Sequence, residues 1–382
     1  MANTVRRVYF GASGLYVAYK IANYFMGNGG DKKEEEKDPV QEFADSIQGA
    51  SAQAMWLNLV GIGDELGLFQ AFIDKGAMTS DELAAATGMD ARYAKEWCLT
   101  IAAFKTLDYE EATNKFSCPP PVKTSVESDT NLCLASATCA LILQRNRLKK
   151  CFMDGTGIGW GEHDECLFSG TRRFFRPFYE GALVSVIPDV IKNIMANPNG
   201  CLMADVGCGQ GLSCRVLSKA FPNMKIKGYD LHQPSIDVAK ELSEGFDNIE
   251  FQCQSSESFY NRTKFDVVCF FDCFHDMAVA GEAAKQAYNM TGPNGKVFLI
   301  ELLAAENDSV SEQLALPTCG MYGCFSCHVC LACSKCNNGD ALGTLCPTSK
   351  HRELFQAAGF KTCESLPSPA NGMGFRVIVV EK

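Results

Sequence analysis

The residues best suited to chemistry in this 382-residue chain are an acid, three closely spaced glycines and a second acid further on. They are Asp205, Gly207, Gly209, Gly211 and Asp230. Glycines let a backbone approach a ligand closely and turn into a helix. A carboxylate about 20 residues beyond such a loop accepts hydrogen bonds from both hydroxyls of a ribose. The spacing therefore predicts a binding site for a ligand that contains a nucleoside.

Two cofactor classes fit an acid at the second position, the nicotinamide dinucleotides and S-adenosylmethionine. Dinucleotide sites prefer the spacing G-x-G-x-x-G, which points a helix N-terminus at a pyrophosphate. Here the glycines recur at every second residue, and Asp205 stands just before them. S-adenosylmethionine has no phosphate, and its ammonium group needs a carboxylate. Asp205 can supply that carboxylate directly or through water, so the loop favours S-adenosylmethionine.

The segment Asp205–Gly211, taken with Asp230, resembles the glycine motif of the class I S-adenosylmethionine-dependent methyltransferases. Residues 266–277, 339–345 and 353–360 resemble a subgroup of that family that has an N-terminal winged helix. The resemblance covers roughly residues 50–382. It implies S-adenosylmethionine as the cofactor, a small-molecule methyl acceptor, and a homodimer formed through the winged helix.

One position departs from the family pattern. Members usually carry an acid after the third strand, where it holds the amino group of adenine. This chain has Gln254–Glu257 there, and Ser255 or Ser256 can do part of that work through a hydroxyl or backbone group. Leu231 and Asp272, which follow the second and fourth predicted strands, complete the candidate cofactor-binding residues.

Methyl transfer from a sulfonium needs the nucleophile, the methyl carbon and the sulfur held in line. A base is needed only where the nucleophile carries a proton, as a hydroxyl does. His275 and Asp276 follow the fourth predicted strand, at the rim where a ligand should lie. Histidine has an ordinary pKa of about 6.5 and is the natural candidate for that base. The alternative is that the two residues cap the next helix or shape the loop.

Seven of the 20 cysteines lie between Cys319 and Cys346. Five of them recur at every third residue from Cys324 to Cys336. Pairs with the spacing C-x-x-C bind zinc, but a period of three also draws a stripe along a helix. The four ligands of a structural zinc site usually come from two separate turns, and this segment has no break between its pairs. We expect a cysteine-rich helix and no metal site, while a thiophilic substrate remains an alternative.

The elements that position these residues alternate between strand and helix. Apolar runs bounded by turns predict strands at residues 202–206, 223–231, 248–253, 265–271, 295–301 and 375–380. Helical spacing falls between them at residues 212–217, 235–244, 282–290 and 349–358. This alternation predicts an α/β fold with a doubly wound, mostly parallel sheet, a Rossmann-like methyltransferase fold that binds ligands at the carboxyl ends of its strands.

Before this sheet, residues 40–125 show a winged-helix pattern. A helix over residues 54–73 breaks near Gly67, and two short helices begin at the caps Thr79 and Asp90, the first ending at Gly88. A strand-and-loop segment follows. The second short helix mixes acids with its basic residues, and 35 basic against 45 acidic residues give the chain a net charge of −10. Both features disfavour nucleic-acid binding, because that needs clustered positive charge.

The remaining predicted divisions are an N-terminal segment at residues 1–39, a helical connecting region at 126–198 and the methyltransferase domain at 199–382. Residues 8–26 are largely apolar and precede a charged linker. They fit a docked helix of a cytoplasmic protein, a weak membrane anchor or a mitochondrial import signal. Scattered single cysteines in apolar runs favour a reducing compartment.

These observations predict S-adenosylmethionine-dependent methyl transfer to a small-molecule acceptor. The alternative is a non-catalytic methyltransferase-like subunit of a larger or membrane-associated assembly. The sequence names neither the acceptor nor the atom that is methylated.

Overall fold

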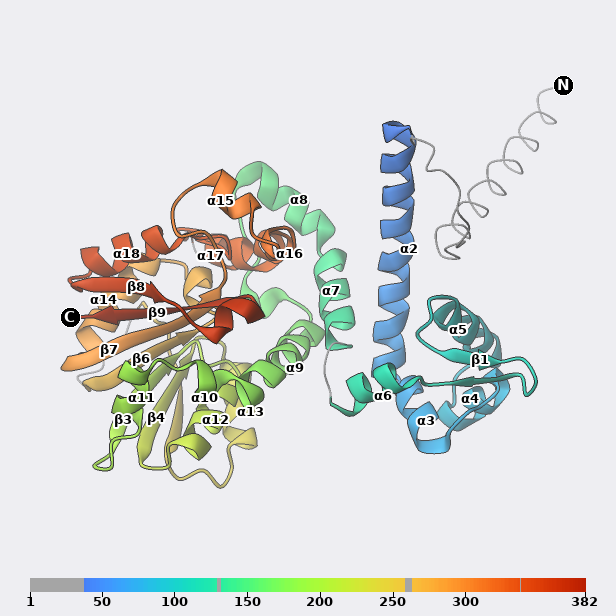
Figure 1. Cartoon of the computed structure of the whole chain (residues 1–382), viewed down its shortest axis with the longest axis horizontal. Coiled ribbons are helices and arrows are strands. Elements are labelled where there is room, and N and C mark those ends of the chain that lie inside the picture. Colours follow the sequence, from blue (N-terminus) through green and yellow to red (C-terminus); the bar gives the residue numbers. More distant parts are fainter. Residues whose placement is uncertain (1–37, 129–131, 258–262, 337) are drawn as a thin grey trace. The chain divides into compact units, whose positions relative to one another are not determined.

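The computed structural model describes residues 38–128, 132–257, 263–336 and 338–382 (Figure 1). The chain divides between Cys139 and Ala140 into two compact units, here called the N-terminal and C-terminal units. This boundary falls inside the predicted connecting region at residues 126–198. The apolar segment at residues 8–26 lies outside the described residues. No described helix is both long and apolar enough to cross a membrane.

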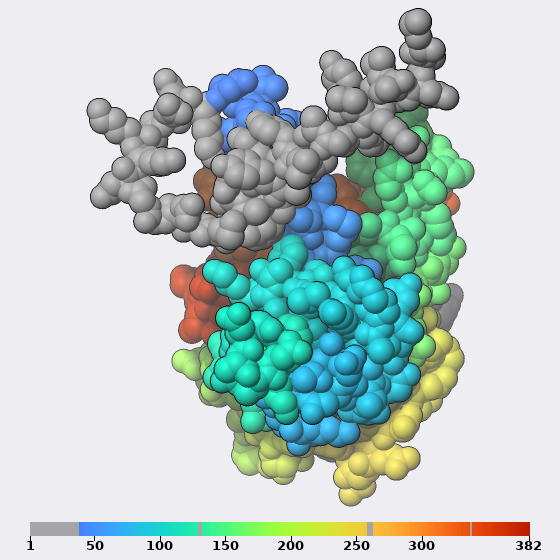
Figure 2. All heavy atoms as spheres, turned by 90° about the vertical axis from the view of Figure 1, so that its right-hand side faces the viewer, coloured from blue at the N-terminus to red at the C-terminus, as the bar shows by residue number. Residues whose placement is uncertain are grey.

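The N-terminal unit has the predicted winged-helix arrangement, seen as a compact body in Figure 2. Its elements are α2 (Pro39–Glu65), α3 (Leu68–Lys75), α4 (Ser80–Thr87), α5 (Ala91–Ala103), the antiparallel hairpin β1 (Asp108–Glu110) and β2 (Lys115–Ser117), and α6 (Pro120–Glu127). Gly67 separates α2 from α3 in a left-handed conformation. Thr79 forms a capping box with Glu82, and Asp90 accepts two backbone N–H groups at the start of α5. These local signals therefore set the predicted helix boundaries.

A single apolar cluster holds this unit together. Trp97 of α5 is its largest buried side chain, and it packs edge-on against Phe69 with 5.2 Å between ring centroids. The indole N–H of Trp97 donates to the carbonyl of Leu59 at 2.9 Å. A buried indole needs such a partner, because an unpaired N–H inside a core is costly. The cluster thus fixes α5 against both α2 and α3.

The C-terminal unit is built on a seven-stranded sheet with the order β5-β4-β3-β6-β7-β9-β8. The strands are β3 (Cys201–Val206), β4 (Met224–Asp230), β5 (Ile249–Cys253), β6 (Phe265–Phe271), β7 (Thr291–Leu302), β8 (Thr362–Leu366) and β9 (Phe375–Glu381). The first five strands in sheet order are parallel to one another. At the far edge β9 pairs antiparallel with β7, and β8 pairs antiparallel with β9. This confirms the predicted mostly parallel, doubly wound sheet, although β8 was not among the predicted strands. Its sequence, Thr-Cys-Glu-Ser-Leu, has too few apolar residues to stand out.

Helices cover both faces of this sheet (Figure 1). The helices that connect its strands are α12 (Leu212–Ala220), α13 (Gln233–Leu242), α14 (Ala280–Met290) and α18 (Thr348–Ala357). Successive strand residues point to opposite faces, so Met203 and Val267 enter one apolar cluster while Ala204 and Val268 enter the other. β6 is buried on both faces and pairs with β3 and β7, so the carboxyl ends of these three strands lie together at one edge of the sheet.

Further helices precede and follow the core strands. They are α7 (Cys133–Leu143), which spans the boundary between units, α8 (Arg145–Asp154), η1 (Trp160–Glu162), α9 (Glu165–Gly181), α10 (Leu183–Val186), α11 (Asp189–Met195), η2 (Phe274–Asp276), α15 (Val310–Leu314) and η4 (Pro369–Met373). Asp164 caps the start of α9, where its side chain accepts the backbone N–H of Cys166. The cysteine run is helical, as predicted, through α16 (Cys319–Phe325), η3 (Ser326–Cys330) and α17 (Leu331–Cys336).

Candidate active site

A cavity of about 670 Å³ opens at the carboxyl ends of β3, β4 and β6, within the C-terminal unit. Its floor is the glycine loop after β3. Its walls come from α9, from the turn after β6 and from α17. Most of the predicted site residues line it, namely Gly207, Gly209, Asp230, Leu231, Ser255, Ser256, Asp272 and Asp276. The remaining three, Asp205, Gly211 and His275, stand behind the wall.

All three glycines of the loop adopt a left-handed conformation, with φ of 75° at Gly207, 52° at Gly209 and 73° at Gly211. A Cβ at Gly211 would lie 2.5 Å from the ring of Phe251, so the loop can pack against β5 only without a side chain there. A Cβ at Gly209 would meet nothing within 4 Å. Gly211 therefore serves packing, whereas Gly209 leaves the cavity floor bare for a ligand.

Asp230 ends β4 and anchors the loop while facing the cavity. One of its carboxylate oxygens accepts the backbone N–H of Gly209 and the other that of His232, both at 2.9 Å. Burial raises the pKa of Asp230, and these two hydrogen bonds oppose that rise. A carboxylate oxygen can accept more than one hydrogen bond, so each retains capacity for a ribose hydroxyl.

Asp205 lies differently from the expectation that its carboxylate reaches the cofactor. It ends β3 fully buried, and Oδ2 accepts hydrogen bonds from the Ser213 hydroxyl at 2.5 Å and the Cys214 thiol at 3.1 Å. Both partners belong to α12 and sit directly behind the glycine loop. Burial raises the pKa of Asp205 to about 6. Its observed contacts tie the loop to the start of α12.

Residues 254–257 form a short polar rim of the cavity after β5. Gln254 donates its backbone N–H to the carbonyl of Asp230 at 2.8 Å, and the hydroxyl of Ser255 accepts the N–H of Glu257 at 3.2 Å. Glu257 in turn accepts the N–H of Val279 at 2.9 Å. The side chain of Leu231 is largely exposed beside this rim. The position of the missing family acid is therefore occupied by hydroxyl and backbone groups.

Asp272 directly follows β6 and is strained. Its φ is 55°, a left-handed value that a non-glycine residue adopts rarely and at some energetic cost. Oδ1 is buried and has no hydrogen-bond partner among the described residues. Burial raises the pKa of Asp272 well above its ordinary value. A strained carboxyl on a cavity wall, with one buried oxygen left without a partner among the described residues, is suited to a ligand that brings positive charge.

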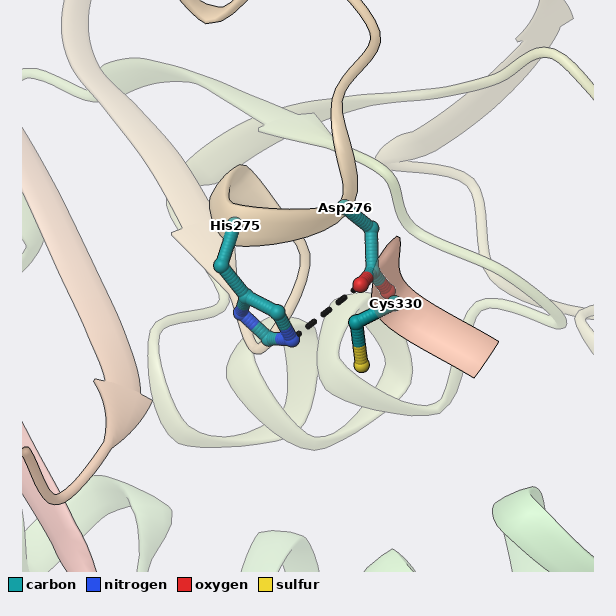
Figure 3. Close-up of side chains that lie close together, drawn as sticks. All are labelled: His275, Asp276 and Cys330. Carbon is teal, nitrogen blue, oxygen red and sulfur yellow. Dashed lines mark ion pairs between the residues drawn. The ribbon is translucent and has the colours of Figure 1, made fainter. Parts of the chain in front are cut away.

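The turn η2 brings His275 between two carboxylates. Its Nδ1 bonds to Glu301 at the end of β7, and its Nε2 lies 3.2 Å from Oδ1 of Asp276 (Figure 3). Glu301 also accepts the backbone N–H of Phe274 at 2.9 Å. Burial lowers the pKa of His275, but the charges of Asp276 and Glu301 outweigh it, and the pKa lies well above its ordinary value. The two carboxylates therefore favour the protonated form of the imidazole.

The structure separates the two predicted catalytic residues by their exposure. His275 is 2% exposed and lies outside the cavity wall, whereas the side chain of Asp276 is 29% exposed and forms part of it. Neither caps the following helix: the N–H groups at the start of α14 donate to Asp340 and Glu257. The outward-facing group of this turn is thus the carboxylate of Asp276.

Several cavity residues were not predicted. They are Trp160, Phe168, Arg172, Cys333 and Cys336, and behind the wall Glu301. Tyr179 of α9 also lines the cavity, whereas Arg176 and Phe178 of the same helix do not. The strong amphipathic pattern of α9 could have indicated a helix with one face on the core. Glu301 carried its own signal, an acid at the end of an otherwise apolar strand.

Comparison with known proteins agrees with this geometry. Residues 203–295 match the methyltransferase domain family, and residues 54–126 match the Rv2258c-like winged HTH domain. A ubiquinone biosynthesis O-methyltransferase of Bradyrhizobium diazoefficiens is 30% identical over 104 residues, which are 27% of this chain and 40% of that enzyme. The match therefore spans well under half of that relative.

Solved structures share the fold at low identity. Human N-acetylserotonin methyltransferase in complex with SAM has a TM-score of 0.63 and 17% identity, over 92% of this chain and 99% of that one. An O-methyltransferase family protein from Burkholderia thailandensis has a TM-score of 0.66 and 17% identity, over 91% and 99%. The chain therefore carries a methyltransferase domain preceded by an Rv2258c-like winged HTH domain, on a fold that it shares with solved methyltransferases.

Proposed function

We propose that this protein transfers the methyl group of S-adenosylmethionine to a hydroxyl oxygen of a small molecule bound in the cavity. The observation that carries the proposal is the position of Asp276, which opens onto the same cavity as the glycine loop and Asp230. The O-methyltransferase name of the curated relative supports oxygen as the acceptor atom.

The described residues fit the cofactor. Asp230 is placed to accept the ribose hydroxyls, and the bare backbone at Gly209 allows close approach. Ser255 and Ser256 lie on the wall toward the adenine side. Asp272 offers a buried carboxyl oxygen without a hydrogen-bond partner in the described chain, which suits the positive charge of the cofactor. When bound there, S-adenosylmethionine supplies an electrophilic methyl group.

Asp276 acts as the base in this proposal. A hydroxyl must lose its proton as it attacks, and a carboxylate within hydrogen-bond reach can take it. Burial raises the pKa of Asp276, which suits a base, while His275 behind it opposes that rise and Glu301 holds the other side of the imidazole. His275 and Glu301 are thus positioning residues, and Asp276 is the group that touches the acceptor.

The cavity walls indicate the type of acceptor. The rings of Trp160 and Phe168 pack at a tilt of 51° with 5.1 Å between their centroids, and the centroid of Phe168 lies 5.0 Å from that of the His232 ring. Tyr179 closes the wall near Asp272, and burial raises its pKa well above the ordinary value. The aromatic walls suit a ligand with apolar surface, which shares the cavity of about 670 Å³ with the cofactor. We infer a planar or aromatic hydroxyl compound as the acceptor.

The assembly and location of the protein are further parts of this proposal. We infer a homodimer formed through the N-terminal unit, where α2 exposes Phe43, Ile47 and Met55. Sedimentation of the full chain should show a dimer, and a monomer at all concentrations would contradict it. We infer a cytoplasmic location because single cysteines scattered through apolar runs suit a reducing compartment.

Calorimetry with S-adenosylmethionine and S-adenosylhomocysteine tests the cofactor site first. We expect both to bind, and no binding at millimolar ligand would overturn the proposal. Turnover is then measured on a panel of phenols and other hydroxyl compounds, with detection of methylated product. Cofactor binding without turnover on any acceptor, together with stable copurifying proteins, would favour the non-catalytic subunit instead.

A further inference from the structure

The imidazole, carboxylate and thiol of His275, Asp276 and Cys330 converge on one point beside the cavity (Figure 3). His275 and Asp276 come from the turn after β6, and Cys330 comes from the end of η3, more than fifty residues later. One potential ligand atom from each side chain lies within 4.8 Å of the others. Nitrogen, oxygen and sulfur in such a group are the ligand types that zinc takes in proteins.

The contact between Nε2 of His275 and Oδ1 of Asp276 is long for a hydrogen bond between charged groups. Such bonds measure about 2.7–2.9 Å, and this separation is 3.2 Å. Oδ1 of Asp276 is buried and accepts no hydrogen bond from any described residue. Two ligands of one tetrahedral zinc, with bonds of about 2.0–2.2 Å, lie about 3.4 Å apart. The observed spacing is therefore closer to that of two ligands of a shared cation.

The surroundings of His275 are those of a metal ligand. Metal-bound histidines usually donate their other ring N–H to a carboxylate, which fixes the ring and makes the bound nitrogen more basic. Glu301 occupies that position here, is itself buried, and is held by the N–H of Phe274. Of the three residues Asp276 alone lines the cavity, and its Oδ1 is buried in the wall.

We propose that Nε2 of His275, the carboxylate of Asp276 and Sγ of Cys330 bind one divalent cation that favours nitrogen and sulfur ligands, such as zinc. The site uses a single member of the cysteine run, not its C-x-x-C pairs, and differs from the expectation of no metal. Binding replaces the proton between Nε2 and Asp276 and releases the thiol proton to solvent. Because the cation then engages Asp276, methyl transfer stops; this consequence alone rests on the proposed function.

Cobalt titration of the full, reduced chain tests the site without any need for activity. We expect one equivalent of Co²⁺ to bind with a thiolate-to-cobalt charge-transfer absorption, and Zn²⁺ to displace it. Cys330→Ser should abolish that absorption, whereas Cys324→Ser, which removes an exposed thiol of the same helical segment, should retain it. An unchanged absorption in Cys330→Ser, or no stoichiometric binding by the unaltered chain, would overturn the proposal.

Two further variants keep the test decisive if Cys330→Ser folds poorly. Asp276→Asn should weaken Co²⁺ binding while leaving the thiol in place, and unchanged affinity would contradict the site. Glu301→Gln should lower metal affinity about ten- to hundredfold, the usual effect of removing the carboxylate behind a metal-bound histidine. Calorimetry with S-adenosylhomocysteine reports the cofactor site separately. Stoichiometric Co²⁺ binding with undiminished turnover would leave the metal site standing and exclude Asp276 as the base.

Discussion

The two sides of the cavity are built in different ways. The side that we propose for the cofactor consists of the turns after β3, β4 and β5, where each residue is positioned by neighbours close in sequence or on the adjacent strand. The acceptor side combines α9, the turn after β6, the end of β7 and α17. The first side therefore depends on local backbone conformation, and the second depends on how distant segments pack. Substitutions on the two sides should have separable effects.

The largest expected effect is on the acceptor side. Asp276→Asn should reduce the rate of methyl transfer about 10²- to 10⁴-fold, the usual contribution of a positioned base. S-adenosylhomocysteine affinity should stay near that of the unaltered protein, because Asp276 is assigned to the acceptor. Single-turnover kinetics and calorimetry on one preparation measure both. Asp340→Asn is the matched control, since Asp340 caps α14 outside the cavity wall. If Asp276→Asn lost cofactor affinity as much as rate, Asp276 would serve the cofactor too, and the proposed separation of the two sides would be wrong.

On the cofactor side, Asp230→Ala should weaken S-adenosylhomocysteine binding about ten- to hundredfold, from the loss of hydrogen bonds worth about 1.5–3 kcal/mol to a charged group. The same change frees the N–H groups of Gly209 and His232, so the melting temperature should fall as well. Calorimetry and thermal unfolding measure the two effects. A lowered melting temperature with unchanged affinity would make Asp230 a structural cap and move the cofactor site elsewhere.

The glycine loop offers a matched pair. Gly211→Ala places a methyl group 2.5 Å from the ring of Phe251 at a φ of 73°, so unfolding free energy should fall by about 1–3 kcal/mol. Gly209→Ala has the same kind of backbone strain without a clash and should destabilise the fold less. Its methyl group should instead hinder the cofactor. Chemical denaturation and ligand affinity separate the two, and equal stability losses would contradict the assigned roles.

The smallest effect concerns Asp205 and pH. Its folded pKa of about 6 lies above the ordinary value of 3.8, so the unfolded chain loses this proton first as pH rises. Stability from this group is therefore full below the ordinary pKa and is lost as pH rises toward 6. Asp205→Asn should flatten the decline in melting temperature over that window. An unchanged pH profile would show that Asp205 does not titrate there.

Local rules account for most of what the sequence alone determined. The three positive φ values require glycine, Thr79 and Asp90 supply their own helix caps, and apolar runs bounded by turns identify the parallel strands. The loop, Asp230 and the winged helix are defined within short windows of chain. Each could be predicted because its conformational cause lies within a few residues of its effect.

Tertiary structure decided the rest. Asp205 turns into the core because α12 presents Ser213 and Cys214 to it, and Asp276 faces the cavity while His275 does not. Glu301 lies 26 residues from His275 and meets it only because β6 and β7 pair side by side. Cys330 reaches the same point because the helical segment that contains it packs against η2 through α17. Such meetings depend on the pairing of distant segments, which no local pattern records, so the acceptor side of the site emerged only with the folded chain.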